Sequence, residues 1–253
     1  MPSVTAFKAQ PNDIQPLRQL FLQENNFQIR YDACHQRGWA DPYLLALNGI
    51  TVGYGAIKGR DIPDRDTVFE FFVLRPFRNE SSHLFREFVA ASGAKYIECQ
   101  SNDLQLSAML YEYANSIQSD TTLFEDHTIT HHAVEGLQLR LRRDEDEVFQ
   151  HSIEPVGDYV LELKNGGIVA TGGFFLHYNV PFADLYMEVR EDCRRRYFGT
   201  VLVQELKKSC YLAGRVPAAR CSTQNIASRA TLLKAGMRVC GFMLLGTVTP
   251  AAS

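Results

Sequence analysis

An internal repeat at a spacing of 116 residues constrains the fold of this 253-residue chain more than any other feature. The segment Phe71–Arg78 parallels Met187–Arg194, so Val73 aligns with Val189. A fixed long spacing indicates that one structural unit has been duplicated. We therefore expect two copies of one α/β domain.

Two predicted β-hairpins support the repeat. The alternating apolar run that begins at Tyr43 leads into Asn48-Gly49, and the one that begins at Tyr159, 116 residues later, leads into Asn165-Gly166. Asn-Gly between two such runs is the strongest short-range hairpin signal. Each copy should therefore contain the same pair of antiparallel strands.

Composition bounds the possible environments and partners. The chain is 45% hydrophobic, carries a formal net charge of −3 and is long enough for two modest cores. It has no apolar run of roughly the 20 residues that span a membrane, and Met1–Asp13 lacks an apolar signal core. Its six cysteines contain no CxxC pair, which is typical of free thiols in a reducing compartment. We expect a cytoplasmic protein that binds neither nucleic acid nor membrane, with an oligomeric state that is left open.

The segment Asp184–Gly246 is the part of the chain that indicates a chemistry. Asp184–Val189 alternates as a half-buried strand, and an arginine-rich turn and an amphipathic helix ending at Gly214 follow it. A short strand around Pro217–Cys221 leads to Asn225, a good N-cap for a further helix. A helix N-terminus beside Arg194, Arg195 and Arg196 suits a phosphate-bearing cofactor.

These residues resemble a known family. The stretch Val189–Gly199, with the later pattern of Asn225, Ser228, Leu233, Lys234 and Gly236, is similar to the GNAT superfamily of acyl-CoA-dependent N-acetyltransferases. The resemblance implies an α/β fold of the α+β type, with a mixed sheet. It predicts two tandem GNAT-like domains, each a mixed, mostly antiparallel sheet flanked by helices. We expect a degenerate domain over 1–125 and a domain with the acyl-CoA site over 126–253.

The resemblance also implies acetyl-CoA as the acyl donor. The Val189 N–H should polarise the thioester, and Asn225 should bind the pantetheine arm. The predicted cofactor-binding residues are Met187, Val189, Arg194, Arg195, Arg196, Tyr197, Phe198, Gly199, Thr200, Asn225 and Ser228. No metal is expected, because His127, His131 and His132 lie within one predicted linker rather than on a helix.

Tyr197 departs from the family motif. The motif reads [RQ]-x-x-G-x-[GA], and spacing from the strand places Arg194 at its first position and Tyr197 at its first glycine. A tyrosine there should need an ordinary φ and a ring that points away from the cofactor. The alternative register begins at Arg196 and keeps Gly199 as the first glycine, but loses the small residue at the end.

The two copies differ where the chemistry would occur. The first copy has Asn79-Glu-Ser-Ser-His83 in place of the glycine-bearing turn, and Glu80 would repel a phosphate. The second copy has a spacing of only 17 residues between Arg142 and Tyr159. It should therefore contain one short helix or none where the family has two.

The predicted function is transfer of an acetyl group from acetyl-CoA directly to the primary amine of a small-molecule or peptide acceptor. Glu188 is the candidate base, although a cross-strand or surface role is the plainer interpretation. The family often has a tyrosine acid where this chain has Leu232, so Tyr186 is the candidate acid, with Tyr178 and Tyr197 as alternatives; packing is the plainer role for each. A non-catalytic acyl-CoA-binding or interaction module is the alternative function.

Overall fold

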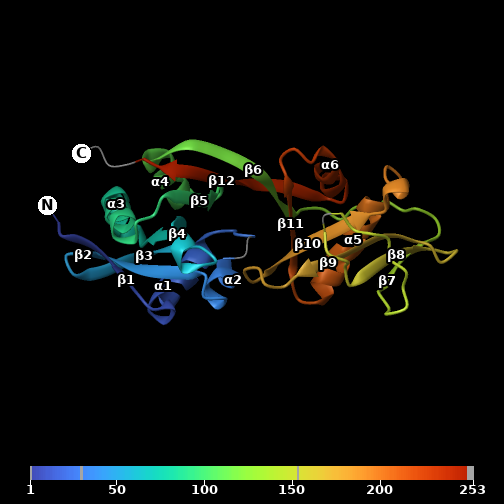
Figure 1. Ribbon diagram of the computed structural model, residues 1–253, viewed down its shortest axis with the longest axis horizontal. Helices are drawn as coiled ribbons and strands as arrows, with labels where there is room; N and C mark the ends of the chain where they lie inside the picture. The colour runs from blue at the N-terminus through green and yellow to red at the C-terminus, as the bar shows by residue number, and fades with distance from the viewer. Residues whose placement is uncertain (1, 29–30, 153, 250–253) are drawn as a thin grey trace. The chain divides into compact units, whose positions relative to one another are not determined.

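The computed structural model describes residues 2–28, 31–152 and 154–249 (Figure 1). The chain forms two compact units. Unit 1 contains the residues up to Asp120 together with those from Gly241 onward, and unit 2 contains Thr121–Cys240.

Unit 1 is a mixed sheet covered on both faces by helices. Its strand order is β1-β2-β3-β4-β5-β12, and only β4 and β5 pair in parallel. The strands are β1 (Val4–Lys8), β2 (Ala40–Leu47), β3 (Ile50–Lys58), β4 (Thr67–Val73), β5 (Tyr96–Gln100) and the Gly241–Val248 part of β12 (Met237–Val248). The helices are α1 (Pro11–Glu24), α2 (Tyr31–Gln36), α3 (Ser81–Ser92) and α4 (Leu104–Tyr113), with 3₁₀ turns at Ile62–Asp64 and Arg75–Glu80.

The two faces of β4 contribute to two cores in unit 1, and a register shift beside Phe69 puts Phe69 on the same face as Phe72. Phe71 and Val73 pack with the apolar faces of α3 and α4. Phe69 and Phe72 pack with residues of α1 and α2. The two cores confirm the expected arrangement of helices on both faces of the first sheet.

Unit 2 repeats the sheet but covers it differently. Its order is β6-β11-β10-β9-β8-β7, and only β10 and β11 pair in parallel. The elements are the Thr121–Asp126 part of β6 (Ala114–Asp126), β7 (Leu137–Leu141), β8 (Tyr159–Leu163), β9 (Ile168–Phe175), β10 (Phe182–Val189), a 3₁₀ turn (Glu191–Cys193), α5 (Phe198–Leu212), β11 (Val216–Ser222) and α6 (Ile226–Lys234).

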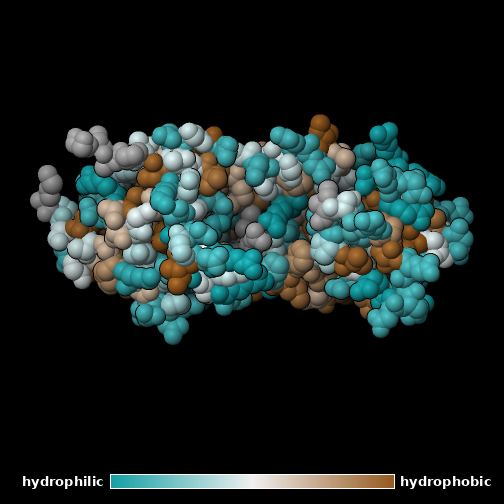
Figure 2. All heavy atoms as spheres, in the orientation of Figure 1, coloured by the Kyte–Doolittle hydropathy of each residue, from teal (hydrophilic) through white to brown (hydrophobic). Residues whose placement is uncertain are grey.

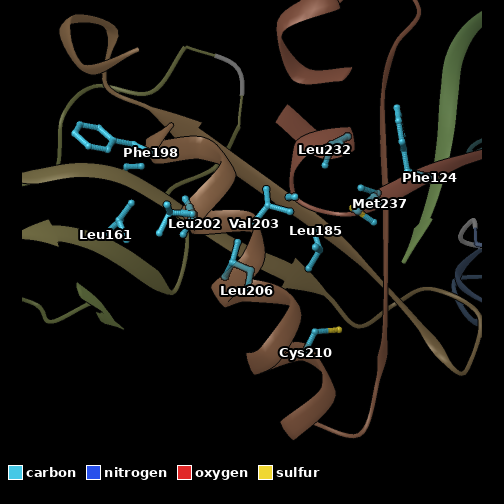
Figure 3. Packing of buried hydrophobic residues seen from close by; sticks show 14 of the residues in the cluster. Phe124, Leu161, Leu185, Phe198, Leu202, Val203, Leu206, Cys210, Leu232 and Met237 are labelled. Carbon is cyan, nitrogen blue, oxygen red and sulfur yellow. The ribbon is translucent and has the colours of Figure 1, made fainter. Parts of the chain in front are cut away.

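The core of unit 2 lies between its sheet and the helices α5 and α6. Leu202 and Leu206 of α5 and Leu232 of α6 pack with Leu185 of β10 (Figure 3). Between Arg142 and Tyr159, residues 142–152 and 154–158 contain no helix. This agrees with the short spacing in the sequence and leaves the opposite face of the sheet to an irregular segment.

The unit boundaries differ from the expected division at residue 125. The predicted linker, Ser119–His132, is largely a strand, because β6 runs without interruption from Ala114 to Asp126. Its second half pairs with β11, and Gly241–Val248 pairs with β5. Each unit therefore completes its sheet with a strand that lies outside its own sequence repeat.

The surface drawn in Figure 2 is mixed in hydropathy, and the cysteines form no disulfide. Hydrophilic and hydrophobic residues are interspersed over the face drawn in Figure 2. Among the residues that the structure describes, no helix is both long and apolar enough to cross a membrane. All six cysteines are free.

Candidate functional site

The two parallel strands of unit 2 separate partway along their length. β10 pairs with β11 only from Phe182↔Val216 to Leu185↔Ala219. Beyond this point β10 continues from Tyr186 to Val189 paired with β9 alone. The separation leaves one edge of the last four residues of β10 without a strand partner.

The peptide groups of Val189 face this opening. Arg190 N–H donates to the Val169 carbonyl at 2.9 Å, so these opposed residues form a hydrogen-bonded pair with β9. Because pairing alternates along an antiparallel ladder, Val189 directs its N–H and C=O away from β9. Arg194 Nε donates to the Val189 carbonyl at 3.3 Å. No acceptor meets the Val189 N–H within the described parts of the chain.

The turn after β10 forms a concave array of peptide N–H groups. Arg195 and Tyr197 both have φ of 64°, and α5 begins directly after Tyr197 without a side-chain cap. The first N–H groups of a helix have no intrahelical acceptor, so those of Phe198, Gly199 and Thr200 are available. Left-handed residues beside a helix N-terminus create an anion-binding nest, which the helix dipole reinforces.

The conformation of Tyr197 corrects one expectation and supports another. Its φ is left-handed rather than ordinary, so the requirement for an ordinary φ was wrong. Since glycine is the residue that adopts this region freely, the conformation supports the register that places Tyr197 at the first motif glycine. Tyr197 is 50% exposed, and its ring contacts two neighbours, His132 and Lys234.

Gly199 is tightly enclosed at the start of α5. A Cβ at this position would lie 3.2 Å from Thr231 Cγ2 and 3.3 Å from both Met187 Cε and Val189 Cγ2. The close approach brings the helix N-terminus against the end of β10 and against α6. Any larger residue would push the array of N–H groups away from the Val189 peptide.

The other predicted cofactor residues divide into side-chain and backbone contributors. Phe198 and Thr200 are buried, so only their peptide groups can reach a ligand. Arg196 lies over the Phe198 ring, with its guanidinium carbon 4.9 Å from the ring centroid. Asn225 caps α6, because its Oδ1 accepts the Ser228 N–H at 3.0 Å. Among the residues that the structure describes, no acceptor meets the Asn225 Nδ2 group.

The candidate catalytic residues lie on the opposite face of β10. Met187 and Val189 pack with α5, so alternation puts Tyr186 and Glu188 on the opposite face, where Ser152 and Glu154 contact Glu188. Glu188 is 8% exposed and accepts hydrogen bonds from Ser152 N–H (2.9 Å), Ser152 Oγ (2.7 Å) and Glu154 N–H (3.1 Å). The Glu188 carboxylate therefore anchors the irregular segment to the sheet.

Tyr186 is half-buried on the same face. Its ring stacks on Phe175 with a centroid separation of 4.3 Å. Burial raises the pKa of Tyr186, and the nearby carboxylates of Asp158 and Glu154 add to the effect while Arg142 opposes it. The phenol therefore keeps its proton at neutral pH. Leu232, at the family's tyrosine position, is a core residue and leaves no proton donor there (Figure 3).

Two further carboxylates on this face were not singled out from the sequence. Burial raises the pKa of Asp184 to about 6 against the opposing attraction of Arg220, whose Nε lies 3.2 Å away. Burial also raises the pKa of Glu154. The alternation along β10 could have identified Asp184 from the sequence, because Asp184 shares a face of the strand with Tyr186 and Glu188.

The equivalent opening in unit 1 is closed. β4 pairs with β5 only at Thr67↔Tyr96 and Val68↔Ile97, so these strands also separate. The Val73 N–H, the counterpart of the Val189 N–H, donates to Gln105 Oε1 at 3.0 Å. A side chain from α4 therefore takes the hydrogen bond that remains unmade in unit 2.

The turn of unit 1 also lacks the N–H array. Arg75–Glu80 is a 3₁₀ turn that runs into α3, and none of its residues has a positive φ. Arg78 repeats the contact of Arg194, since its Nε donates to the Val73 carbonyl at 3.0 Å. Its charge is met by the Glu24 carboxylate, which also lies 3.3 Å from Arg75 Nε. The turn of unit 1 therefore differs in conformation from the turn before α5 in unit 2.

Comparison with solved structures identifies the fold. An acetyltransferase of the GNAT family from Colwellia psychrerythraea superposes with a TM-score of 0.72 at 13% identity, covering 98% of this chain and all of the other. A GCN5-related N-acetyltransferase from Sphaerobacter thermophilus gives 0.60 at 13% identity, covering 99% and 97%. A tandem GNAT protein from the clavulanic acid biosynthesis pathway gives 0.57 at 12% identity, covering 99% and 100%.

Comparison by sequence, in contrast, finds no match. No protein-family profile matches the chain, and no curated protein matches it. The fold class inferred from the motifs is confirmed by the structural likeness over the whole length. The chain therefore has the fold of the GNAT acetyltransferases, as two GNAT-like units in tandem.

Proposed function

We propose that the protein is an N-acetyltransferase that binds acetyl-CoA in unit 2 and passes the acetyl group directly to a primary amine. The observation that carries the proposal is the Val189 N–H, which faces the strand opening without an acceptor in the described chain while its counterpart Val73 N–H is occupied. A peptide N–H held at such a point can polarise a thioester carbonyl and stabilise the oxyanion of the tetrahedral intermediate.

The donor would lie along the opening and across the turn. The diphosphate would take the N–H groups of Phe198, Gly199 and Thr200, and Arg195 and Arg196 would add positive charge. Asn225 Nδ2 would donate to the pantetheine arm. When bound, acetyl-CoA supplies the activated acetyl group, and the chain supplies orientation and charge stabilisation.

The acceptor would approach from the face of β10 that carries Tyr186 and Glu188. A primary amine is protonated in neutral solution and must lose its proton before it attacks. We assign Glu188 as the base, with Glu154 as a second candidate because burial raises the pKa of its carboxyl group toward neutrality. Tyr186 is assigned as the proton donor to the departing thiolate.

A cavity beyond the end of β10 is lined in part by carboxylates. The segment Glu145–Phe149 lines a cavity of about 560 Å³ together with Gly166–Ile168 and Arg190. Two exposed carboxylates in this lining, Glu145 and Glu147, would attract a cationic amine.

A non-catalytic acyl-CoA-binding module is the second candidate. It is favoured by Glu188, which is engaged with three donors from Ser152 and Glu154, and by Leu232, which replaces a tyrosine. Both functions require the same donor site, so binding and turnover have to be measured separately.

Calorimetry with acetyl-CoA, followed by detection of released thiol in the presence of an amine panel, tests the proposal. Gly199→Glu should abolish binding, because the side chain fills the helix N-terminus and brings negative charge. Ser81→Glu, at the start of the equivalent helix of unit 1, is the matched control and should leave binding unchanged. Binding without turnover on any amine would favour the module, and absence of binding by the wild type would contradict both functions.

A further inference from the structure

A cavity of about 410 Å³ lies in unit 1, at the beginning of β4 and β5 and away from the end where these strands separate. Ile97 and Cys99 of β5 pack in the core under α3 and α4, so alternation puts Tyr96 and Glu98 on the opposite face of the sheet, where both line the cavity. Thr67 of β4, which pairs with Tyr96, lines the cavity beside them. Every lining residue belongs to unit 1, and the volume is in the range of small-molecule sites.

Two chain connections form the walls of the cavity. Trp39 lies between α2 and β2, where its N–H donates to the Cys34 carbonyl at 2.8 Å and its carbonyl accepts the Gly59 N–H at 3.0 Å. Gly59 begins the connection from β3 to β4, and a Cβ at this position would collide with the Asp64 carbonyl. These backbone contacts fix both connections around the cavity.

Two aromatic residues of the lining, Trp39 and Tyr96, lie outside the two cores of unit 1. Tyr96 is 39% exposed. Arg37 lies over one face of the Trp39 ring, with its guanidinium carbon 4.9 Å from the ring centroid, so a ligand would contact the remaining ring surface. The lining therefore offers aromatic surface to a flat apolar group.

The lining also contains two cationic and two anionic side chains, and only one pair is matched within the protein. Lys58 Nζ donates to the Glu98 carboxylate, so these two charges neutralise each other. Arg60 and Asp64 are exposed, and neither side chain forms an ion pair or a hydrogen bond with any residue that the structure describes. The cavity therefore presents one positive and one negative group to a ligand.

We propose that this cavity binds an aromatic α-amino acid, with its carboxylate at Arg60, its ammonium group at Asp64 and its ring against Trp39 and Tyr96. A guanidinium and a carboxylate form charge-assisted hydrogen bonds with groups of opposite charge, and the aromatic residues bury the apolar ring. The cavity shares no residue with the proposed donor site of unit 2. The inference therefore goes beyond the proposed function and does not depend on it.

Trp39 is the single tryptophan of the chain, so its fluorescence reports whether the cavity is occupied. Three probes separate the charges: L-phenylalanine, 3-phenylpropionate, which lacks the ammonium group, and 2-phenylethylamine, which lacks the carboxylate. L-phenylalanine should change the Trp39 emission of the full-length protein and bind with a Kd of about 1 mM or tighter in calorimetry. Each of the other two probes should bind about fivefold more weakly or worse.

Two variants assign the charges to residues. Arg60→Met should weaken L-phenylalanine and 3-phenylpropionate about fivefold or more and leave 2-phenylethylamine unchanged or slightly tighter. Asp64→Asn should weaken L-phenylalanine and 2-phenylethylamine to a similar extent and leave 3-phenylpropionate unchanged or slightly tighter. Arg86→Met, at an exposed arginine of α3 on the other face of the sheet, is the matched control and should change none of the three affinities.

Three results would overturn the inference. The first is a wild type that shows neither a binding heat nor a change in Trp39 emission with about 10 mM L-phenylalanine. The second is a binding heat without any change in that emission, which would place the ligand elsewhere. The third is that Arg60→Met and Asp64→Asn, shown by circular dichroism to be folded, leave all three affinities intact or lower them equally. Acetyl-CoA takes no part in these measurements, so none of these results bears on the proposed function.

Discussion

Gln105 Oε1 accepts the Val73 N–H at 3.0 Å, so a side chain of unit 1 occupies the position that corresponds to the proposed thioester site of unit 2. Gln105 is the second residue of α4, two positions after the capping Asp103. Ala227 is the second residue of α6, two positions after the capping Asn225. One side chain at this helical position therefore distinguishes a closed opening from an open one.

The first prediction transfers this closure to unit 2. Ala227→Gln should place an amide oxygen against the Val189 N–H and lower both acetyl-CoA affinity and turnover by at least about tenfold, which corresponds to about 1.4 kcal/mol. Calorimetry and a thiol-release assay measure the two effects. Ala230→Gln, an exposed position on the same helix, is the control. Equal behaviour of the two variants would show that the Val189 N–H is not part of the donor site.

The second prediction concerns the residue of unit 1 that aligns with Tyr186. Glu70, 116 residues earlier, is fully buried and accepts hydrogen bonds from Arg18 Nη2 and Tyr54 Oη, both at 3.0 Å. His35 Nε2 also lies 3.0 Å from its carboxylate. The Arg18 guanidinium and His35 hold the pKa of Glu70 down to about 2 despite burial. Glu70 therefore has a structural role in unit 1, at the position that aligns with Tyr186 of unit 2.

Glu70→Gln should therefore destabilise the protein strongly, by about 3 kcal/mol, because the buried Arg18 loses its ion pair with Glu70 and keeps only the one with Asp32. Glu24→Gln is the matched control, since its ion pairs with Arg75 and Arg78 lie at the surface and should contribute at most about 1 kcal/mol. Urea unfolding measures both. A change of less than about 1 kcal/mol in the free energy of unfolding for Glu70→Gln would show that the hydrogen bonds around Glu70 do not depend on the charge of its carboxylate.

Local patterns in the sequence predicted most of each unit. The Asn48-Gly49 hairpin formed as expected, with positive φ at both residues, and α5 ended before Gly214 with its left-handed φ. The repeat at 116 residues also located the arginine contact, because Arg78 and Arg194 bond the carbonyls of Val73 and Val189. These features are encoded within short windows, where turn chemistry and periodicity act directly.

Features that depend on distant partners were not predictable in this way. Thr122 on β6 pairs with Cys221, 99 residues later, and nothing in Ala114–Asp126 specifies that partner. The groups that donate hydrogen bonds to the Glu188 carboxylate come from a segment without periodicity, 34 to 36 residues earlier in the chain. The φ of Tyr197 is left-handed, which tyrosine rarely adopts. This conformation could therefore be recognised only from the structure.

The strand exchange leads to a third prediction, on fragments. A fragment of residues 121–240 keeps every strand of unit 2, whereas 126–253 removes all of the segment that pairs with β11, residues 121–125, and leaves Gly241–Val248 without β5. Exposed strand edges promote association. We expect 121–240 to show a cooperative thermal transition and 126–253 to aggregate. The reverse behaviour, measured by calorimetry and light scattering, would contradict the observed division of the chain.

The fourth prediction follows from the carboxyl group of Asp184. Burial raises the pKa of Asp184 from 3.8 to about 6, so the folded state binds its proton more tightly than the unfolded state does. Ionisation is then harder in the folded protein, and stability is lost as the pH rises from about 4 to about 6, by roughly 2 to 3 kcal/mol at most. Asp184→Asn should flatten the pH dependence of the free energy of unfolding over this range while keeping an acceptor for Arg220. Urea titrations at several pH values measure it, and Asp192→Asn, at an exposed turn, is the control that should leave the slope at pH 4–6 unchanged. If Asp184→Asn leaves the wild-type slope intact, the carboxyl of Asp184 titrates normally and cannot accept a proton near neutral pH.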